Sequence, residues 1–143
     1  EQSLSAAPSH LGGTHPHNKG TRGVCHYPGT VSAAFYGFPS REMKVIGITG
    51  TKGKTTSALM TAHILNKSGI PAGYIGTSGI NYAGRTYPTV NTTPESLELQ
   101  RIMREMADSG IRAVVMEVSS QGLYLGRVRG IDFDTVCFTN FSP

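Results

Sequence analysis

The segment Gly50–Thr56 has the residue types and the spacing that bind phosphate groups. It reads Gly-Thr-Lys-Gly-Lys-Thr-Thr, a shortened P-loop, because the strict pattern has a glycine where this chain has Ile48. Glycines let several backbone N–H groups point at one anion, and the N-terminus of a following helix adds positive potential. Lys54 can reach the β- and γ-phosphates, and the Thr55 hydroxyl can bind Mg²⁺. The segment therefore predicts nucleotide binding by Gly50, Thr51, Lys52, Gly53, Lys54, Thr55 and Thr56.

Glu117 is the second candidate for chemistry, because it directly follows the apolar run Ala113–Met116. Ligands of open α/β sheets bind at the carboxyl ends of the strands, and hard cations prefer oxygen ligands. A carboxylate there can hold Mg²⁺ across from a phosphate loop. A strand-end glutamate that faces water is the alternative for this residue taken alone.

Short β-branched or apolar runs predict the strands that would position these residues. They lie at Lys44–Thr49, Pro71–Gly76, Ala113–Met116 and Asp134–Thr139, and the last two have the continuous apolar character of strands buried on both faces. Residues 80–87 alternate and predict a small hairpin that turns at Ala83-Gly84.

Two helical patterns separate these strands. The first runs from about Lys54 to Ser68, with Leu59, Ala62 and Leu65 on one face, and it ends at Gly69. Thr93-Pro94 opens the second, with Thr93 as its N-cap and Leu97, Ile102 and Met106 on its apolar face, and Gly110 ends it. Strands that alternate with helices predict an α/β fold of the P-loop type, with a mostly parallel sheet and flanking helices. The alternative for residues 50–56 is a glycine-rich turn with an incidental lysine. It is disfavoured because a predicted strand precedes the segment and a predicted helix follows it.

The composition of the chain excludes several classes of protein. Its 143 residues are 38% hydrophobic and suffice for one domain, and no stretch approaches the roughly 18 apolar residues of a membrane span. The net charge of +4 is scattered, which argues against nucleic acid as a partner. Cys25 and Cys137 form no CxxC pair, so we expect neither a disulfide scaffold nor a zinc ribbon. A protein with so few cysteines is expected in a reducing, cytoplasmic setting.

The first 44 residues differ from the rest of the chain. Small residues, Pro and Gly dominate residues 1–30, which predict a loop-rich or disordered arm, and 31–44 predict a connector to the α/β part at 45–143. The arm contains possible metal ligands, but their spacing is not helical and no apolar frame holds them, so a flexible polar arm is favoured over a metal site. These residues are His10, His15, His17, Cys25 and His26.

Several ordered motifs resemble those of the Mur ligases, which extend the peptide stem of the cell-wall precursor. Residues 48–56 resemble the ATP loop of that family. Residues 91–96 (Asn-Thr-Thr-Pro-Glu-Ser) and 116–123 (Met-Glu-Val-Ser-Ser-Gln-Gly-Leu), with 130–134 and 138–140, resemble the branch that adds the third amino acid to UDP-N-acetylmuramoyl-L-alanyl-D-glutamate. The resemblance runs from about Ala33 to Pro143 and implies the ATP-binding central domain.

The resemblance also implies roles for individual residues. Lys54 and Glu117 would be catalytic, with Thr55 and Glu117 as metal ligands, and Asn140 would lie beside the nucleotide. The UDP-N-acetylmuramoyl-dipeptide would contact Asn91, Thr92, Thr93, Ser119 and Arg127. Many members of the family carry His where this chain has Gln121. Glutamine cannot be protonated, so the resemblance implies no acid–base or metal role for this position.

The implied reaction is an ATP- and Mg²⁺-dependent amide ligation. ATP would phosphorylate a carboxylate of the dipeptide substrate to an acyl phosphate, and an incoming amino acid would displace the phosphate. The implied partners are the UDP-N-acetylmuramoyl-dipeptide and that amino acid, in a monomeric protein that neither binds nucleic acid nor inserts into membranes. Because the family carries further segments beyond those matched, we expect this chain to be part of the central domain and inactive alone.

Three alternatives stay open. One is another ligase of the same fold, such as a folylpolyglutamate or cyanophycin synthetase, although residues 91–96 and 116–123 disfavour it. Another is a non-catalytic nucleotide-binding module. The third, a P-loop kinase or GTPase, should show a strict Walker loop and its own base-recognition motif, and neither is present in this sequence.

Overall fold

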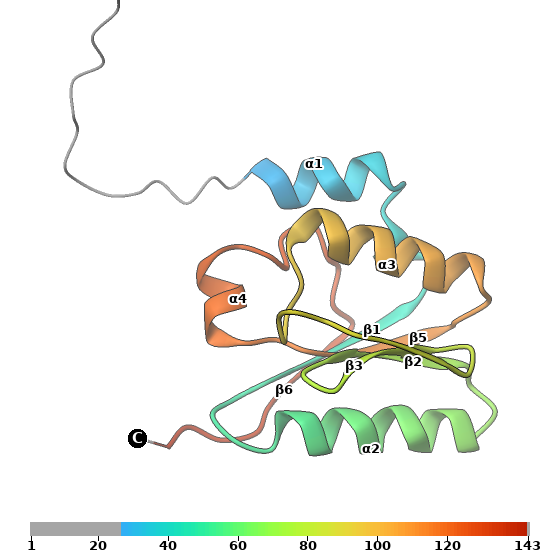
Figure 1. Cartoon of the computed structure of the whole chain (residues 1–143), viewed down its shortest axis with the longest axis vertical. Coiled ribbons are helices and arrows are strands. Elements are labelled where there is room, and N and C mark those ends of the chain that lie inside the picture. The colour runs from blue at the N-terminus through green and yellow to red at the C-terminus, as the bar shows by residue number, and fades with distance from the viewer. Residues whose placement is uncertain (1–26, 143) are drawn as a thin grey trace, which may run out of the picture.

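The computed structural model describes residues 27–142, which form a six-stranded sheet with helices on both faces (Figure 1). The strands are β1 (Lys44–Thr49), β2 (Ala72–Gly76), β3 (Gly79–Tyr82), β4 (Arg85–Tyr87), β5 (Ala113–Glu117) and β6 (Thr135–Phe138). The helices are α1 (Tyr27–Phe35), α2 (Lys54–Lys67), α3 (Ser96–Asp108) and α4 (Ser120–Tyr124), with a 3₁₀ turn η1 (Pro39–Arg41).

The strand order across the sheet is β4-β3-β2-β5-β1-β6. β2, β5, β1 and β6 are parallel, and β3 and β4 add an antiparallel hairpin at one edge. The predicted α/β fold with a mostly parallel sheet is confirmed, as is the hairpin, whose turn places Ala83 and Gly84 at φ 48° and 73°. Consequently the carboxyl ends of β1, β2 and β5, where ligands bind in such sheets, lie at one edge.

The helices divide the core into two layers. α2 covers one face of the sheet, and α1, α3 and α4 lie on the other side (Figure 1). The larger layer joins α3 to the sheet and includes Ile75, Leu99, Met103, Met106 and Val114, all fully buried. The smaller layer lies under α2 and consists of Ile48, Ala58, Ala62, Tyr74 and Val115.

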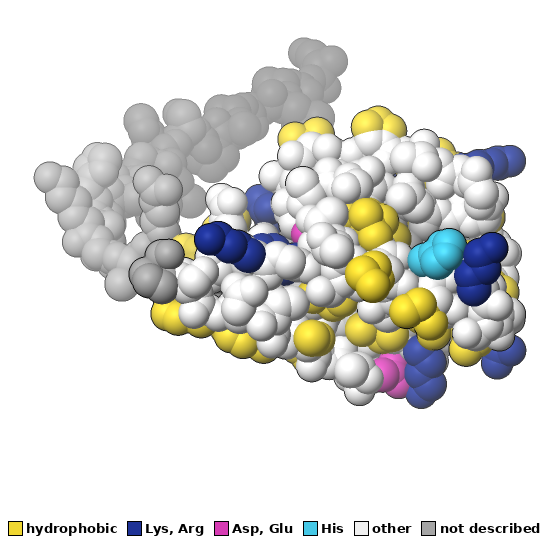
Figure 2. Space-filling view, turned by 90° about the horizontal axis from the view of Figure 1, so that it is seen from below, with side chains coloured by type: hydrophobic (Ala, Val, Ile, Leu, Met, Phe, Trp, Pro, Cys, Tyr) yellow, Lys and Arg dark blue, Asp and Glu magenta, His cyan; other side chains and the backbone are white. Residues whose placement is uncertain are grey.

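The inward face of α2 differs from the prediction at Leu59, whereas Ala62 is buried and Leu65 packs against the same core layer, as predicted. Ala58 and Ala62 are its buried residues, whereas Leu59 is 36% exposed. Small side chains at 58 and 62 let the helix approach the sheet closely, which turns the larger residues outward. Apolar side chains are therefore visible on the α2 side of the molecule (Figure 2), where Met60 and Ile64 are also exposed.

The start of α3 also differs from the prediction. The helix begins at Ser96, and the residue before it, Glu95, caps it with no side-chain hydrogen bond, so Thr93 is not the N-cap. The later start is accompanied by a different apolar face. Leu97 is exposed, whereas Ile102 and Met106 are buried as predicted.

Two further expectations need correction. β6 was predicted as a buried strand, but all four of its residues are exposed, because it pairs with β1 alone at the edge of the sheet. Residues 27–30 were assigned to the amino-terminal arm but form the first turn of α1. The rest of the predicted arm, including its histidines and Cys25, lies outside the described residues. No helix within residues 27–142 is long and apolar enough to cross a membrane.

Candidate functional site

The predicted phosphate loop connects β1 to α2, as its mechanism requires. Gly50 and Gly53 adopt left-handed φ values of 132° and 83°, which other residues rarely reach. A Cβ at Gly50 would also lie 2.9 Å from the carbonyl oxygen of Asn140. Lys54 begins α2, and its Nζ donates hydrogen bonds to the carbonyl oxygens of Gly50 at 2.7 Å and Thr51 at 3.3 Å. The ammonium group thus lies against the loop whose phosphate it is expected to bind.

The segment after β6 holds this loop in place. The Asn140 side chain accepts a hydrogen bond from the Lys52 N–H at 3.1 Å and donates one to the Lys52 carbonyl at 3.0 Å. The Asn140 carbonyl accepts the Thr51 N–H at 3.0 Å, and the Thr139 hydroxyl donates to the Lys52 carbonyl at 2.7 Å. Asn140 therefore lies beside the predicted nucleotide site, where it shapes the loop through its backbone and its side chain.

Glu117 ends β5 with a fully buried side chain. Its Oε1 accepts hydrogen bonds from the Tyr74 hydroxyl at 2.5 Å and the Thr77 N–H at 3.0 Å. Its Oε2 accepts the Thr55 hydroxyl at 2.9 Å and the Thr77 hydroxyl at 3.3 Å. These donors are all neutral, and no basic side chain among residues 27–142 forms an ion pair with it. A buried carboxylate without a cationic partner is costly, which suits a site that receives a cation.

The environment of Glu117 also acts on Tyr74. Burial, together with the hydrogen bond to Glu117, raises the pKa of Tyr74 to about 12. The phenol therefore keeps its proton at neutral pH and serves as a hydrogen-bond donor to the carboxylate.

Thr55 and Glu117 fit a magnesium ion. The Thr55 hydroxyl oxygen and Glu117 Oε2 are 2.9 Å apart. Adjacent ligands of an octahedral Mg²⁺ with bonds of about 2.0–2.1 Å are separated by about 2.9 Å. No group of three or more His, Cys, Asp or Glu that could hold a metal occurs in the part of the chain that the structure describes. Phosphate oxygens and water would supply the other ligands, as is usual for Mg²⁺.

A cluster of hydroxyls lies next to Glu117 at the same edge of the sheet. Thr93 is fully buried, and its hydroxyl donates to the Glu117 carbonyl at 3.1 Å and accepts the Ser119 N–H at 3.0 Å. The Ser119 hydroxyl caps α4 by accepting the Gly122 N–H at 3.0 Å. Thr92 is half-buried, with its hydroxyl 3.0 Å from that of Thr77. Thr92 and Ser119 are thus better placed than Thr93 to contact a ligand.

Arg127 is buried, with 8% of its surface exposed. Its NH1 donates to the Thr93 carbonyl at 3.1 Å, and its NH2 forms an ion pair with Glu95. Its buried Nε has no hydrogen-bond partner among the described residues. It therefore joins the hydroxyl cluster instead of being a solvated surface residue. Of the remaining predicted residues, Asn91 is half-buried beside Thr92, whereas Lys52, Thr56 and Gln121 are exposed.

Comparison with known proteins agrees with this geometry. The family described as the Mur ligase middle domain matches residues 48–143, a range that contains every predicted site residue. The chain belongs to the Mur ligase family.

Two relatives of this chain and one solved structure carry the same name. The chain is 50% identical over 109 residues to the UDP-N-acetylmuramoyl-L-alanyl-D-glutamate--2,6-diaminopimelate ligase of Geobacillus thermodenitrificans, covering 76% of this chain and 22% of that protein. It is 46% identical over 117 residues to the same-named protein of Coxiella burnetii, covering 82% and 24%. A solved structure of a ligase of that name has a TM-score of 0.71 at 26% identity, covering 80% of this chain and 24% of the other. The chain thus spans about a fifth to a quarter of the length of these relatives.

Sequence reasoning missed three residues of this candidate site. Tyr74 and Gly76 lie in β2 and Thr77 directly follows it, and both Tyr74 and Thr77 donate hydrogen bonds to Glu117. The signal that could have found them is the parallel pairing of β2 with β5, which brings the carboxyl ends of both strands together. That pairing joins segments about forty residues apart, so no local pattern reveals it.

Proposed function

We propose that this chain carries the nucleotide site of an ATP-dependent ligase that attaches an amino acid to UDP-N-acetylmuramoyl-L-alanyl-D-glutamate. The observation that carries the proposal is the placement of the buried Glu117 2.9 Å from Thr55 at the start of α2, directly after the phosphate loop. The names of the relatives supply the substrate, because the matched residues 48–143 include the loop, Glu117 and the hydroxyl cluster.

The residues of the chain would bind and orient the reactants. The loop N–H groups and Lys54 would hold the phosphates, and Thr55 and Glu117 would hold Mg²⁺. When bound, MgATP would supply the phosphoryl group that activates the D-glutamate side-chain carboxylate and would leave as ADP. The amine of the incoming amino acid would then displace phosphate and lose a proton to form the amide. The protein contributes position and charge neutralisation, so the reaction needs no nucleophilic side chain.

Substrate contacts are proposed at the same edge of the sheet. Asn91, Thr92 and Ser119 would bind the UDP-N-acetylmuramoyl-dipeptide. Arg127 would hold the Thr93 segment, and its unpartnered Nε is a further donor. Diaminopimelate is proposed as the amino acid, because the relatives are named for it. We place the reaction in the cytoplasm, where a free, exposed thiol such as Cys137 stays reduced.

The test uses the complete gene product that contains these residues. It is incubated with ATP, Mg²⁺ and UDP-N-acetylmuramoyl-L-alanyl-D-glutamate, and with diaminopimelate or lysine in separate reactions. Phosphate release and the mass of the product are measured. We expect the tripeptide product with diaminopimelate, its loss in Lys54→Ala, and normal rates in Lys67→Ala, which removes an exposed lysine at the other end of the same helix.

Other outcomes separate the alternatives. ATP binding without product from either amino acid would favour a non-catalytic nucleotide-binding module. Product formed only from a folate and glutamate would identify another ligase of this fold. A Lys54→Ala protein with unchanged turnover would contradict the role of the phosphate loop itself.

A further inference from the structure

Tyr74 is a buried polar side chain that the proposed reaction does not use. It lies on β2 with 2% of its surface exposed, and its ring packs in the layer under α2 with Ile48 and Val115. Its hydroxyl donates a 2.5 Å hydrogen bond to Oε1 of Glu117, which is 43 residues away in the sequence. A phenylalanine would fill the same space, so the hydroxyl needs an explanation of its own.

The two oxygens of Glu117 accept hydrogen bonds from different groups, and Thr77 contacts both of them. Oε1 accepts from the Tyr74 hydroxyl and the Thr77 N–H, both from β2 or the residue just after it. Oε2 accepts from the Thr55 hydroxyl at 2.9 Å, in the first turn of α2 after the phosphate loop, and more weakly from the Thr77 hydroxyl at 3.3 Å. Because Tyr74 and Thr77 occupy Oε1, the carboxylate is held with Oε2 toward the nucleotide side.

Gly76 provides the space in which this hydrogen bond forms. A Cβ at this position would clash with both Glu117 Oε1 and the Tyr74 hydroxyl, and it would lie 2.7 Å from Cζ of the Tyr74 ring. The backbone of Gly76 is not left-handed, so its conformation does not require glycine. The missing side chain is therefore explained by the contact between the phenol and the carboxylate.

We propose that Tyr74, in the space left by Gly76, is a positioning residue that holds Oε1 of Glu117, so that Oε2 lies beside Thr55 as a magnesium ligand. The inference rests on the proposed role of Glu117 as a metal ligand and adds the residue that orients it. Groups that hydrogen-bond to metal ligands fix their orientation, and their removal weakens metal binding by about 10–100-fold.

The test measures Mn²⁺ binding as a spectroscopic substitute for Mg²⁺. The complete gene product is titrated with Mn²⁺ in the presence of ATP, and free Mn²⁺ is followed by electron paramagnetic resonance. Tyr74→Phe should weaken Mn²⁺ binding about 10–100-fold. Its affinity for ATP without metal should stay within about twofold of the wild type, because the loop N–H groups and Lys54 are untouched.

Tyr82→Phe is the matched control. Tyr82 also lies in the sheet and donates its hydroxyl to a glutamate, Glu105, at 3.1 Å. That hydrogen bond is exposed and is made between β3 and α3, outside the phosphate loop and the Glu117 site. This variant should bind Mn²⁺ as tightly as the wild type.

Gly76→Ala provides a second route to the same contact. The added methyl group would separate the phenol from the carboxylate, so it should weaken Mn²⁺ binding as Tyr74→Phe does. In the double variant the loss should be smaller than the product of the two single losses, because both substitutions remove one interaction. In activity assays, Tyr74→Phe should lower kcat at limiting Mg²⁺, with partial recovery at high Mg²⁺ and an unchanged KM for the dipeptide substrate.

The outcomes distinguish this inference from the function on which it rests. Wild-type Mn²⁺ affinity in Glu117→Gln would overturn the metal role of Glu117. Loss of affinity in Glu117→Gln but not in Tyr74→Phe would overturn only the positioning role. A Tyr74→Phe protein that loses metal-free ATP binding and thermal stability together with Mn²⁺ affinity would show that Tyr74 is merely structural, which also overturns the inference.

Discussion

At the carboxyl ends of the parallel strands, Glu117 is buried and accepts hydrogen bonds only from neutral groups, whereas at the amino ends the acidic residues are exposed and paired with arginine or lysine. Arg41 pairs with Asp132 at 2.9 Å, and Lys44 pairs with Asp134 at 2.6 Å. The two edges of one sheet thus carry polar networks that differ in burial and in charge compensation.

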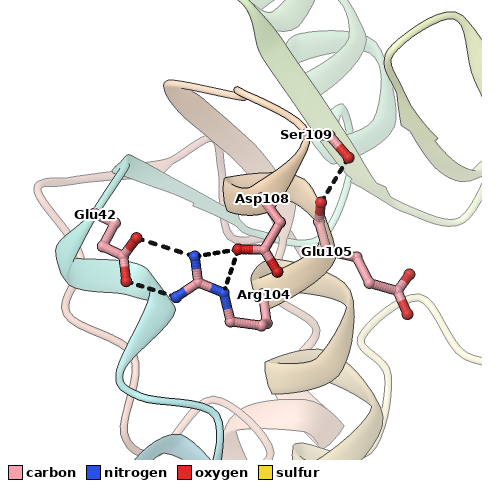
Figure 3. A network of polar contacts seen from close by, with 5 residues as sticks. All are labelled: Glu42, Arg104, Glu105, Asp108 and Ser109. Carbon is pink, nitrogen blue, oxygen red and sulfur yellow. Dashed lines mark hydrogen bonds and ion pairs between the residues drawn. The ribbon is translucent and has the colours of Figure 1, made fainter.

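Arg104 is the centre of a polar network at the amino edge (Figure 3). Its guanidinium binds both carboxylate oxygens of Glu42, at 2.6 and 3.0 Å, and also Asp108 on its own helix. It thereby joins α3 to the segment before β1. The hydrogen bond from Arg104 lowers the pKa of Glu42. Each charge in this network already has a partner, so the network needs no ligand.

The comparison shows which polar groups indicate function. Exposed ion pairs are compensated within the protein and contribute little to stability. A buried carboxylate surrounded by hydroxyls has hydrogen bonds but no opposite charge, and it gains one only when a cation binds. This difference supports the proposal that the functional site lies at the carboxyl edge, whereas the ion pairs of the amino edge need no ligand.

The largest difference between the edges is expected in catalysis. In the complete gene product, Glu117→Gln should lower kcat by about 10²–10³-fold, the magnitude typical of a lost electrostatic contact to the reacting groups. Glu42→Gln should change kcat less than about twofold. Steady-state phosphate release measures both, and equal losses in the two variants would contradict the assignment of function to the carboxyl edge.

A smaller difference is expected in stability. Thr93→Val removes a buried hydroxyl that serves both the Glu117 carbonyl and the Ser119 N–H, so the free energy of unfolding should fall by about 1–3 kcal/mol. Thr92→Val changes a half-buried residue and should cost less than about 0.5 kcal/mol. Urea denaturation measures the free energy of unfolding of both variants. Equal stability of Thr93→Val and Thr92→Val would contradict a stabilising role of the buried Thr93 hydroxyl.

Loss of the exposed Arg104 network should lower thermal stability only slightly, and the size of this loss should depend on salt concentration. Arg104→Ala should lower the midpoint of thermal unfolding slightly at low ionic strength, and this deficit should shrink at about 1 M salt, where the Debye length is about 3 Å. The deficit of Thr93→Val should not shrink, because buried hydrogen bonds are not screened. Calorimetry at both salt concentrations makes the comparison.

The smallest expected effect is the loss of stability at low pH that comes from protonation of Asp134. The hydrogen bond from Lys44, assisted by the Val45 N–H, lowers the pKa of Asp134, so the folded state releases this proton more readily than the unfolded state. The resulting stabilisation is fully present above the ordinary aspartate pKa of about 3.9 and is lost as the pH falls through the lowered pKa. The unfolding midpoints of wild type and Asp134→Asn should therefore differ at pH 6 and converge at low pH. If the difference between the two unfolding midpoints increased at low pH, this explanation of the Asp134 contribution would be contradicted.

Local patterns predicted much of the fold. The strand at 44–49, the glycine-rich loop and the helix that begins at Lys54 are present where expected, because β-branched runs and glycine positions act over a few residues. The hairpin and the ends of α2 and α3 near Gly69 and Gly110 follow the same rule, and both glycines have positive φ values. The roles of the site residues themselves remain predictions.

Tertiary contacts account for the differences. Thr93 reads as a helix cap because it precedes a proline, yet in the structure its hydroxyl binds the end of β5, 24 residues away. Val136 and Phe138 predict a buried strand, but burial depends on which elements pack against β6, and in residues 27–142 it pairs with β1 alone.

The sequence by itself determined that a phosphate loop follows a strand and opens a helix, and that an acidic residue ends another strand, because these features depend on neighbours along the chain. Only the tertiary structure decided that Tyr74, Thr77 and Thr55 surround Glu117 with neutral donors. Those contacts depend on the parallel register of β2 and β5 and on the packing of α2, which join residues 40 to 62 positions apart.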